Sequence, residues 1–530
     1  MVSSSSALNS SRLFAYAAVC LLSGSAVAGA RDLPEWIPGQ LVNTTSGPIL
    51  GHASAWQPLV SEYLGLPYAQ PPVGPLRFAA PQPYEPDGSS PGPFVASEYG
   101  NSCPVNINSD PNATVSYRSF AETLLGRLAQ LDDTFSEDCL KLNVWTAPQI
   151  GLDGQRGNKK SKKAVMVWIY GGGFNSGSST NAGYNGARLA AEHDVVVVSM
   201  NYRTNIFGFP RADFLPDLNL GLLDQRLAVE WVRDNIESFG GDPSRITLFG
   251  QSAGGASVDY YTLAWVKDPI VHAFIAQSGF ATDQTPSKNI SAGWYAASQA
   301  LGCGGAEAGE ATLDCMREKP WQDIMEALEK RGVTPNLGQG GFGPTVDEKV
   351  VFANVTDRRR NGEFIQKPLL VGNTGEEAAF YRLLATANGR NSSGPEIDSV
   401  NLIRCGPRPV ALSRTAKGVP AWRYVYEGEF PNTDIGFPGA WHGGEIAMTF
   451  GANEFMSRRQ STTEQKKLSF VMRTAWTEFA KRPTWGLRGL GWPVYDDSKP
   501  TVIRLGGRNS SRVTLEPNDR FMSGCPKTRS

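Results

Sequence analysis

The sequence has little net charge and few histidines. Its 50 lysines and arginines nearly balance 51 aspartates and glutamates, so the formal net charge is −1. Such a chain lacks the excess positive charge that marks proteins binding nucleic acids or anionic membranes. Four histidines among 530 residues leave few candidates for a catalytic histidine. The content of hydrophobic residues, 41%, is typical of an ordinary globular protein.

Long hydrophobic runs are absent after residue 30, so no later segment reaches the roughly 20 apolar residues of a membrane span. The stretch after Arg12, "LFAYAAVCLLSGSAVAGA", is interrupted by Ser and Gly and ends in small residues. This order is typical of a secretory signal peptide, with cleavage after Ala28 or Ala30. The C-terminal "SGCPKTRS" carries no lipid-anchor signal. We therefore expect a signal peptide over residues 1–30 and a single secreted domain over residues 31–530, with no stable membrane anchor.

Cysteines and glycosylation sequons agree with secretion. Six cysteines remain after the expected signal peptide: Cys103, Cys139, Cys303, Cys315, Cys405 and Cys525. In an oxidising compartment they predict three disulfides, although the number alone leaves fifteen pairings open. N-x-S/T sequons, which are glycosylation acceptors in secreted proteins, begin at Asn43, Asn112, Asn289, Asn354, Asn391 and Asn509.

Short hydrophobic runs alternate with segments of helical periodicity. Helical spacing is clearest in residues 221–236 and in the segment after Ser252. The predicted buried strands are residues 164–170, 194–203, 245–250, 273–279 and 367–372. Apolar strands separated by helices indicate a mainly parallel sheet covered on both faces. Functional residues of such sheets gather in loops after the carboxyl ends of the strands.

One segment, between Cys103 and Cys139, interrupts this alternation. The apolar residues on one side of its predicted helix are Phe120, Leu124, Leu128 and Leu131. Two interpretations remain open. Residues 117–131 form either a helix packed on the main body or a mobile amphipathic flap over a site, tethered by a disulfide at its base.

The sequence "LFGQSAGG" places Ser252 between a predicted strand and a predicted helix. This is the context of a nucleophile elbow, where a serine sits on a sharp turn. Gly250 and Gly254 fit that turn, because side chains there would clash where the two backbones nearly touch. The backbone N–H of Ala253, at the helix N-terminus, would stabilise an oxyanion. A simple glycine-rich turn is the alternative.

A serine hydroxyl is a poor nucleophile without a base. In this kind of site the nucleophile, acid and histidine follow each other along the chain, so His52 and His193 do not fit. His272 follows Ser252 by only 20 residues, with no strand between them to present an acid. His442, in the glycine-flanked loop "GAWHGGEIAMTFG", remains as the candidate base.

The acid is expected between Ser252 and His442, in a loop after a strand. Glu376 and Glu377 both follow the predicted strand 367–372, and spacing alone does not choose between them. Either carboxylate would accept the Nδ1–H of His442 and stabilise the imidazolium.

The glycine-rich segment "IYGGGFNSG" would supply further N–H donors to an oxyanion. Its G-x-x-x-x-G spacing, from Gly172 to Gly177, also suggests a phosphate-binding loop. That interpretation fails because Ser178 and Ser179 stand where such a loop requires lysine.

Seven segments in this order resemble the type-B carboxylesterases, in the cholinesterase and lipase branch of the α/β-hydrolases. They are "GLPYAQPPVGPLRF", "SEDCLKLNVW", "YGGGF", "NYRTNIFGF", "GLLDQRLAVEWVRDNIESFGGDP", "GQSAGG" and "HGGEI". The resemblance covers nearly all of residues 31–530 and implies an α/β-hydrolase fold. That fold has a large, mainly parallel central sheet with helices on both faces and a disulfide-tethered insertion near the N-terminus.

The resemblance also implies a two-step hydrolysis of a small-molecule ester, with no metal and no organic cofactor. Ser252 would attack the carbonyl while His442 takes its proton, and water would then hydrolyse the acyl-enzyme. The family's acid lies five residues beyond a glycine that corresponds to Gly372, which selects Glu377, although Ala378 stands where the family usually has Gly. The implied oxyanion donors are the N–H groups of Gly172, Gly173 and Ala253.

The resemblance also implies particular disulfides and ion pairs. The implied disulfides are Cys103–Cys139 and Cys303–Cys315, which leaves Cys405 with Cys525. The implied structural ion pairs are Arg77–Glu137 and Arg203–Asp224.

Two differences from the cholinesterase sequence pattern narrow the range of expected ester substrates. Gln251 stands where they carry Glu, and residues 104–138 contain no Trp. The loss of a carboxylate and of a cation–π surface argues against choline esters. We therefore expect a secreted carboxylic-ester hydrolase. A lipase with an amphipathic lid and a non-catalytic adhesion protein are the alternatives.

Overall fold

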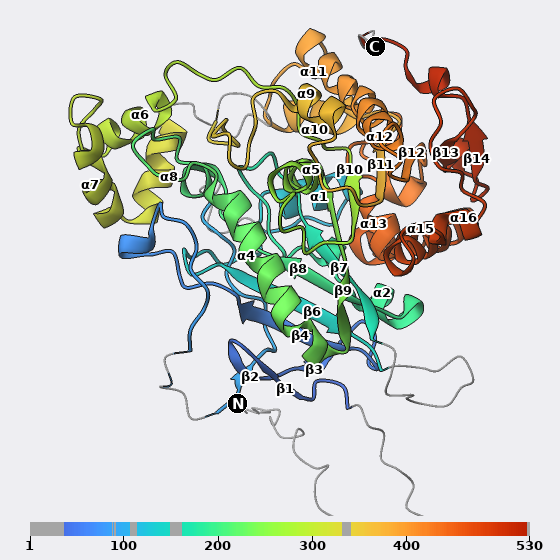
Figure 1. Ribbon diagram of the computed structural model, residues 1–530, viewed down its shortest axis with the longest axis horizontal. Helices are drawn as coiled ribbons and strands as arrows, with labels where there is room; N and C mark the ends of the chain where they lie inside the picture. The colour runs from blue at the N-terminus through green and yellow to red at the C-terminus, as the bar shows by residue number, and fades with distance from the viewer. Residues whose placement is uncertain are drawn as a thin grey trace, which may run out of the picture. The chain divides into compact units, whose positions relative to one another are not determined.

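The centre of the computed structural model is an eleven-stranded mixed sheet (Figure 1). In spatial order its strands are β14 (Thr514–Glu516), β13 (Val502–Leu505), β12 (Ala421–Tyr426), β11 (Leu369–Thr374), β10 (Ala273–Gln277), β9 (Gly241–Gln251), β7 (Lys163–Ile169), β8 (Val195–Met200), β6 (Lys141–Thr146), β4 (Ser61–Pro67) and β3 (His52–Ala53). The structure describes residues 37–86, 88, 92–105, 114–148, 162–330 and 341–526.

Contacts define one unit from Trp36 to Ser530. The expected signal peptide and the sequon at Asn112 lie outside the described residues. Within the described ranges, no helix is long and apolar enough to cross a membrane.

Strand direction changes only at the two edges of the sheet. All neighbours from β8 to β13 are parallel. Strands β6, β4 and β3 at one edge and β14 at the other pair antiparallel. The five strands predicted from the sequence correspond to β7, β8, β9, β10 and β11. The last of them extends beyond Gly372, because Asn373 and Thr374 pair with β12.

Helices cover both faces of this sheet. Those described are α1 (Phe120–Leu128), α2 (Ala187–His193), α3 (Asn205–Gly208), α4 (Leu220–Asn235), α5 (Ala253–Ala264), α6 (Ala292–Ala300), α7 (Thr312–Glu318), α8 (Trp321–Lys330), α9 (Val355–Asn361), α10 (Ala378–Ala387), α11 (Pro395–Ser399), α12 (Pro407–Thr415), α13 (Ile446–Phe450), α14 (Asn453–Ser457), α15 (Thr463–Lys481) and α16 (Gly486–Gly489).

The alternation of side chains along the strands shows which helices share a face. Phe274 of β10 contacts Tyr261 of α5, whereas the next residue, Ile275, is the register partner of Phe249 on β9. Phe249 contacts Phe450 of α13. Because successive strand residues point to opposite faces, α5 and α13 lie on opposite sides. Helix α4 crosses in front of the strands on the α5 side (Figure 1).

Two smaller parts complete the fold. Near the N-terminus, β1 (Leu41–Thr44), β2 (Gly47–Leu50) and β5 (Phe94–Val95) form a three-stranded sheet. Helices α6, α7 and α8 gather away from the central strands (Figure 1). They pack around a second hydrophobic core that includes Trp294, Met316 and Ile324.

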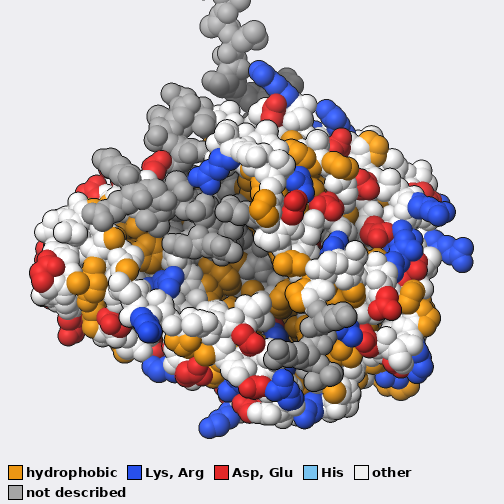
Figure 2. All heavy atoms as spheres, turned by 90° about the horizontal axis from the view of Figure 1, so that it is seen from above, with side chains coloured by type: hydrophobic (Ala, Val, Ile, Leu, Met, Phe, Trp, Pro, Cys, Tyr) orange, Lys and Arg blue, Asp and Glu red, His pale blue; other side chains and the backbone are white. Residues whose placement is uncertain are grey.

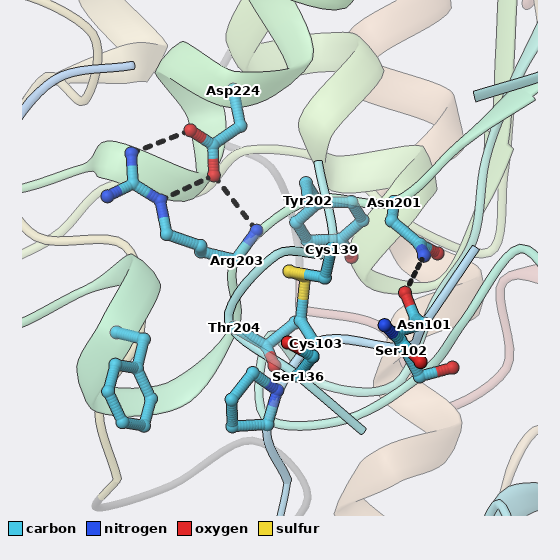
Figure 3. Close-up of a disulfide and its surroundings, with 12 residues drawn as sticks. Asn101, Ser102, Cys103, Ser136, Cys139, Asn201, Tyr202, Arg203, Thr204 and Asp224 are labelled. Carbon is cyan, nitrogen blue, oxygen red and sulfur yellow. Dashed lines mark hydrogen bonds and ion pairs between the residues drawn. A yellow bond between two sulfur atoms is a disulfide. The ribbon is translucent and has the colours of Figure 1, made fainter. Parts of the chain in front are cut away.

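Three disulfides join the pairs Cys103–Cys139, Cys303–Cys315 and Cys405–Cys525, as the resemblance implied. The first closes the insertion that carries α1 and lies against the segment that follows β8 (Figure 3). In that segment the Asn201 side chain donates to the Asn101 carbonyl at 3.0 Å. Arg203 forms the expected buried ion pair with Asp224. The disulfide, the Asn201–Asn101 contact and the other expected ion pair, between Arg77 and Glu137, together fix the base of the insertion.

Candidate active site

Ser252 lies on the turn between β9 and α5, at the carboxyl end of a central strand. Its backbone has φ 57° and ψ −124°, a strained conformation for a residue with a side chain. The turn holds because the Ser252 N–H donates to the carbonyl of Gln277 at 2.8 Å. A Cβ on Gly254 would lie 2.0 Å from the carbonyl oxygen of Ile169, so only glycine fits there. This is the strained strand–turn–helix expected of a nucleophile elbow.

The glycine-rich segment that begins at Gly171 follows β7 and lies beside Ser252. Gly171 and Gly172 line the same pocket as Ser252. Gly172 has φ 124°, and Gly173 has φ 62°. These backbone conformations turn successive peptide groups in a way that residues with a Cβ rarely adopt. Ala253 is the first residue of α5, where backbone N–H groups have no acceptor within the helix.

His442 contacts Glu377 and not Glu376. The distance from His442 Nδ1 to Glu377 Oε2 is 2.5 Å, and both side chains are buried. Glu377 immediately precedes α10. The Glu376 carboxylate points elsewhere and accepts from the Asn401 amide at 2.8 Å. Geometry thus distinguishes two neighbouring residues that spacing alone did not.

The other oxygen of Glu377 is held from two strands. Oε1 accepts from the Ser278 hydroxyl at 2.8 Å and from the Thr374 N–H at 2.8 Å. Ser278 follows β10 and Thr374 ends β11. Both donors stabilise the ionised carboxylate and fix the oxygen that faces His442.

Ser252 and His442 line one pocket, and the stripe on α1 forms part of its wall. The four residues predicted to share one side of that helix all line it: Phe120, Leu124, Leu128 and Leu131. Seen from above in Figure 2, the molecule is hollowed near its centre, and hydrophobic side chains (orange) surround the hollow. Helix α1 therefore borders the site.

The segment after α1 is anchored to the glycine-rich loop. The Gln130 side chain accepts from the Gly177 N–H at 2.9 Å. Asp133 accepts from Ser102 at 2.7 Å and from Thr180 at 2.9 Å. These bonds hold the C-terminal half of the insertion beside the elements that carry Ser252.

Gln251 and Glu445 are buried polar residues near Ser252 and His442. Gln251 lines the pocket, and its Nε2 has no partner among the described residues. Glu445 accepts from the Gln277 amide at 3.2 Å. Burial raises the pKa of Glu445 to about 7, and the charge of Glu377 adds to the shift.

Sequence reasoning missed Ser278, Glu445 and the aromatic wall of the pocket. Ser278 is the second-last residue of the predicted strand 273–279, so its position near a carboxyl end was a usable signal. Glu445 follows His442 by three residues in the "HGGEI" segment, but nothing local shows that it is buried. The rings of Phe380 and Tyr381 lie 6.0 and 5.5 Å from the His442 ring.

The other histidines lie elsewhere. His52 contacts Glu62, His193 ends α2 and His272 precedes β10. Within the described residues, no group of three or more His, Cys, Asp or Glu side chains is placed to hold a metal ion.

A mostly parallel sheet with a strained serine turn at the end of a central strand defines an α/β-hydrolase fold. A solved structure of PNB esterase shares it, with a TM-score of 0.72 and 28% identity over 92% of this chain and 99% of that one. A sequence profile described as "Carboxylesterase family" matches residues 38–401. The chain belongs to the carboxylesterase family of ester hydrolases.

Two fungal relatives are similar over most of their length. Chlorogenic acid esterase of Aspergillus niger is 35% identical over 451 residues, which are 84% of each chain. Secreted lipase 5 of Gibberella zeae is 35% identical over 500 residues, covering 88% of this chain and 90% of that protein.

Proposed function

We propose that this chain is a secreted carboxylic-ester hydrolase that works through Ser252, His442 and Glu377 and forms an acyl-enzyme. The observation that carries the proposal is the buried contact between His442 and Glu377 in the pocket that Ser252 lines. Glu377 holds Nδ1, so Nε2 is the ring nitrogen left for proton transfer. That Nε2 is buried and has no partner among the described residues.

The reaction proceeds in two steps. Ser252 Oγ attacks the ester carbonyl while His442 Nε2 accepts its proton, and the Glu377 carboxylate stabilises the imidazolium. The tetrahedral intermediate collapses as His442 returns the proton to the leaving alkoxide, which departs as an alcohol. Water then attacks the acyl-enzyme by the same route, and Ser252 regains its proton as the acid leaves.

The oxyanion of each intermediate is stabilised by the N–H groups of Gly172, Gly173 and Ala253. The positive φ of the two glycines and the position of Ala253 at the start of α5 support this role.

Secretion is supported by three disulfides and by exposed sequons. The described sequon residues are all exposed: Asn43, Asn289, Asn354, Asn391 and Asn509. The printed name of the relative from Gibberella zeae includes the word "secreted". Expression in a eukaryotic host should release a protein that begins near residue 29 or 31. Its apparent mass should fall on treatment with an endoglycosidase.

A lipase is the second candidate, because the apolar stripe of α1 lines the pocket and one relative is named a lipase. Activity on dispersed triglyceride would then rise abruptly when the substrate exceeds its solubility. Equal turnover of dissolved short-chain esters and emulsions would exclude interfacial activation.

The direct test is pre-steady-state hydrolysis of p-nitrophenyl acetate. An acyl-enzyme mechanism predicts one equivalent of nitrophenol per Ser252 when deacylation is slow. A substrate panel that includes chlorogenate, short-chain esters and triglyceride would then define the preferred class. No activity on any member by folded protein would contradict the proposal and would favour the non-catalytic alternative.

A further inference from the structure

We infer that Trp441 limits the size of the alcohol group of the ester, because its side chain separates the substrate pocket from a second cavity. Trp441 lines the pocket that contains Ser252 and His442, and it also lines a separate cavity under residues 428–439. Among the described residues, Trp441 is the only one that lines both the substrate pocket and the second cavity. The inference rests on the proposed role of His442.

The second cavity offers more room to a water-sized group, although the total empty space of the two is similar, 970 Å³ against 1080 Å³. The space that a water-sized group can occupy is 510 Å³ there, against 110 Å³ in the pocket beside Ser252. Apolar residues of its lining include Phe430, Ile435 and Phe437, with Glu429 and Asp434 among the polar ones. The space is therefore suited to an apolar group that carries hydroxyls or other hydrogen-bond donors, and Trp441 is the described residue that it shares with the substrate pocket.

The indole of Trp441 is fixed in this position from both sides. Its Nε1–H donates to the Thr433 carbonyl at 3.1 Å, on the side of the second cavity. On the side of the substrate pocket, its ring lies 5.9 Å from Phe120 of α1 and 6.4 Å from Phe380 of α10. A side chain with a hydrogen bond and two aromatic neighbours is a wall with one preferred position.

Because Trp441 lies beside His442, the alcohol group of the ester, and not the acyl group, is the part that contacts its side chain. His442 must return a proton to the leaving alkoxide oxygen, so that oxygen lies within hydrogen-bond distance of its ring. The alcohol group therefore leaves past the side chains around the imidazole, and Trp441 directly precedes His442. The acyl group remains on Ser252 and is not required to cross this wall.

The test measures kcat/KM for acetate esters of alcohols of increasing size, from methyl to octyl and naphthyl, with a pH-stat. Trp441→Ala should raise the ratio for bulky against small alcohols by at least tenfold. In a parallel series of p-nitrophenyl esters with longer acyl groups, the relative kcat/KM values should stay within about twofold of those of the wild type. Leu124→Ala is the matched control, because Leu124 lines the substrate pocket but not the second cavity.

Unchanged alcohol selectivity in Trp441→Ala, or an equal gain in Leu124→Ala, would overturn the inference. Trp441→Phe and Trp441→Leu keep an apolar side chain of intermediate size and should give intermediate ratios, so the series remains informative if the Ala variant does not fold. Labelling of Ser252 by a serine-reactive phosphonate is measured on every variant. An unlabelled wild type would contradict the proposed function, whereas labelled variants with wild-type selectivity contradict only the role of Trp441.

Discussion

The backbones of Glu376 and Trp441 pair with each other. Each of these residues directly precedes one partner of the Glu377–His442 contact. They form a parallel bridge, and the Glu376 N–H donates to the Ala440 carbonyl at 3.0 Å. The acid loop and the histidine loop are thus joined by main-chain hydrogen bonds. This arrangement fixes which of two adjacent glutamates reaches the imidazole.

Substitution of each glutamate in turn should therefore show that Glu377, and not Glu376, is needed for activity. Glu377→Gln should lower kcat by about 10⁴-fold, because loss of the carboxylate leaves the imidazole in the wrong tautomer. Glu376→Gln is the matched control and should lose far less, since its carboxylate contacts Asn401. Both are measured as kcat on p-nitrophenyl acetate. An inactive Glu376→Gln beside an active Glu377→Gln would show that the acid is misassigned.

Sequence reasoning reached Ser252 and His442 because their constraints are local or ordered along the chain. Glycines at positions 250 and 254 identify the turn. Chain order excludes two of the four histidines, and the lack of a strand between Ser252 and His272 excludes a third. The role of Ser278 depends on a hydrogen bond to a residue 99 positions away, and Gln277 meets Glu445 across 168 positions. Such contacts exist only after the parallel strands assemble, so periodicity and spacing carry no sign of them.

Ser278 should act by positioning Glu377 and not by touching the substrate. Ser278→Ala should lower kcat about tenfold with little change in KM, because a hydrogen bond to a charged group is worth about 1.5–3 kcal/mol. Ser298→Ala is a suitable control, since it removes a buried hydroxyl of α6 that donates to the Gly304 carbonyl at 2.7 Å, away from the site. Equal losses in the two variants would indicate a general effect on folding.

The buried Glu445 makes stability depend on pH. Its pKa is raised from 4.5 to about 7 by burial and by the charge of Glu377. Between these pH values the folded chain retains a proton that the unfolded chain releases, so the free energy of unfolding contributed by Glu445 falls as pH rises. Above pH 7 both states are ionised and the effect levels off.

Glu445→Gln should remove this dependence. The difference in unfolding free energy between wild type and Glu445→Gln should decrease steadily from pH 4.5 to 7, as measured by chemical denaturation. Parallel stability curves for the two proteins would show that folding does not raise the pKa of Glu445 and that the burial argument is wrong.

Gln251 leaves this position of the pocket wall without a carboxylate, which predicts no preference for esters with a cationic alcohol group. Gln251→Glu places a carboxylate at a buried position in the pocket wall. A cationic alcohol group would then be attracted electrostatically, and about 1.4 kcal/mol of that attraction corresponds to a tenfold gain. The expected result is a roughly tenfold rise in kcat/KM for acetylcholine relative to its neutral isostere 3,3-dimethylbutyl acetate. An unchanged ratio would place Gln251 outside the reach of the alcohol group.

The most direct test of the account is labelling of folded protein with a serine-reactive fluorophosphonate, followed by mass spectrometry of the peptides. The account predicts a single adduct, on Ser252, with stoichiometric loss of esterase activity. Ser252→Ala should take up no label and should lose about 10⁶-fold in kcat. Full activity in Ser252→Ala, or an adduct on another serine that accounts for the inactivation, would contradict it.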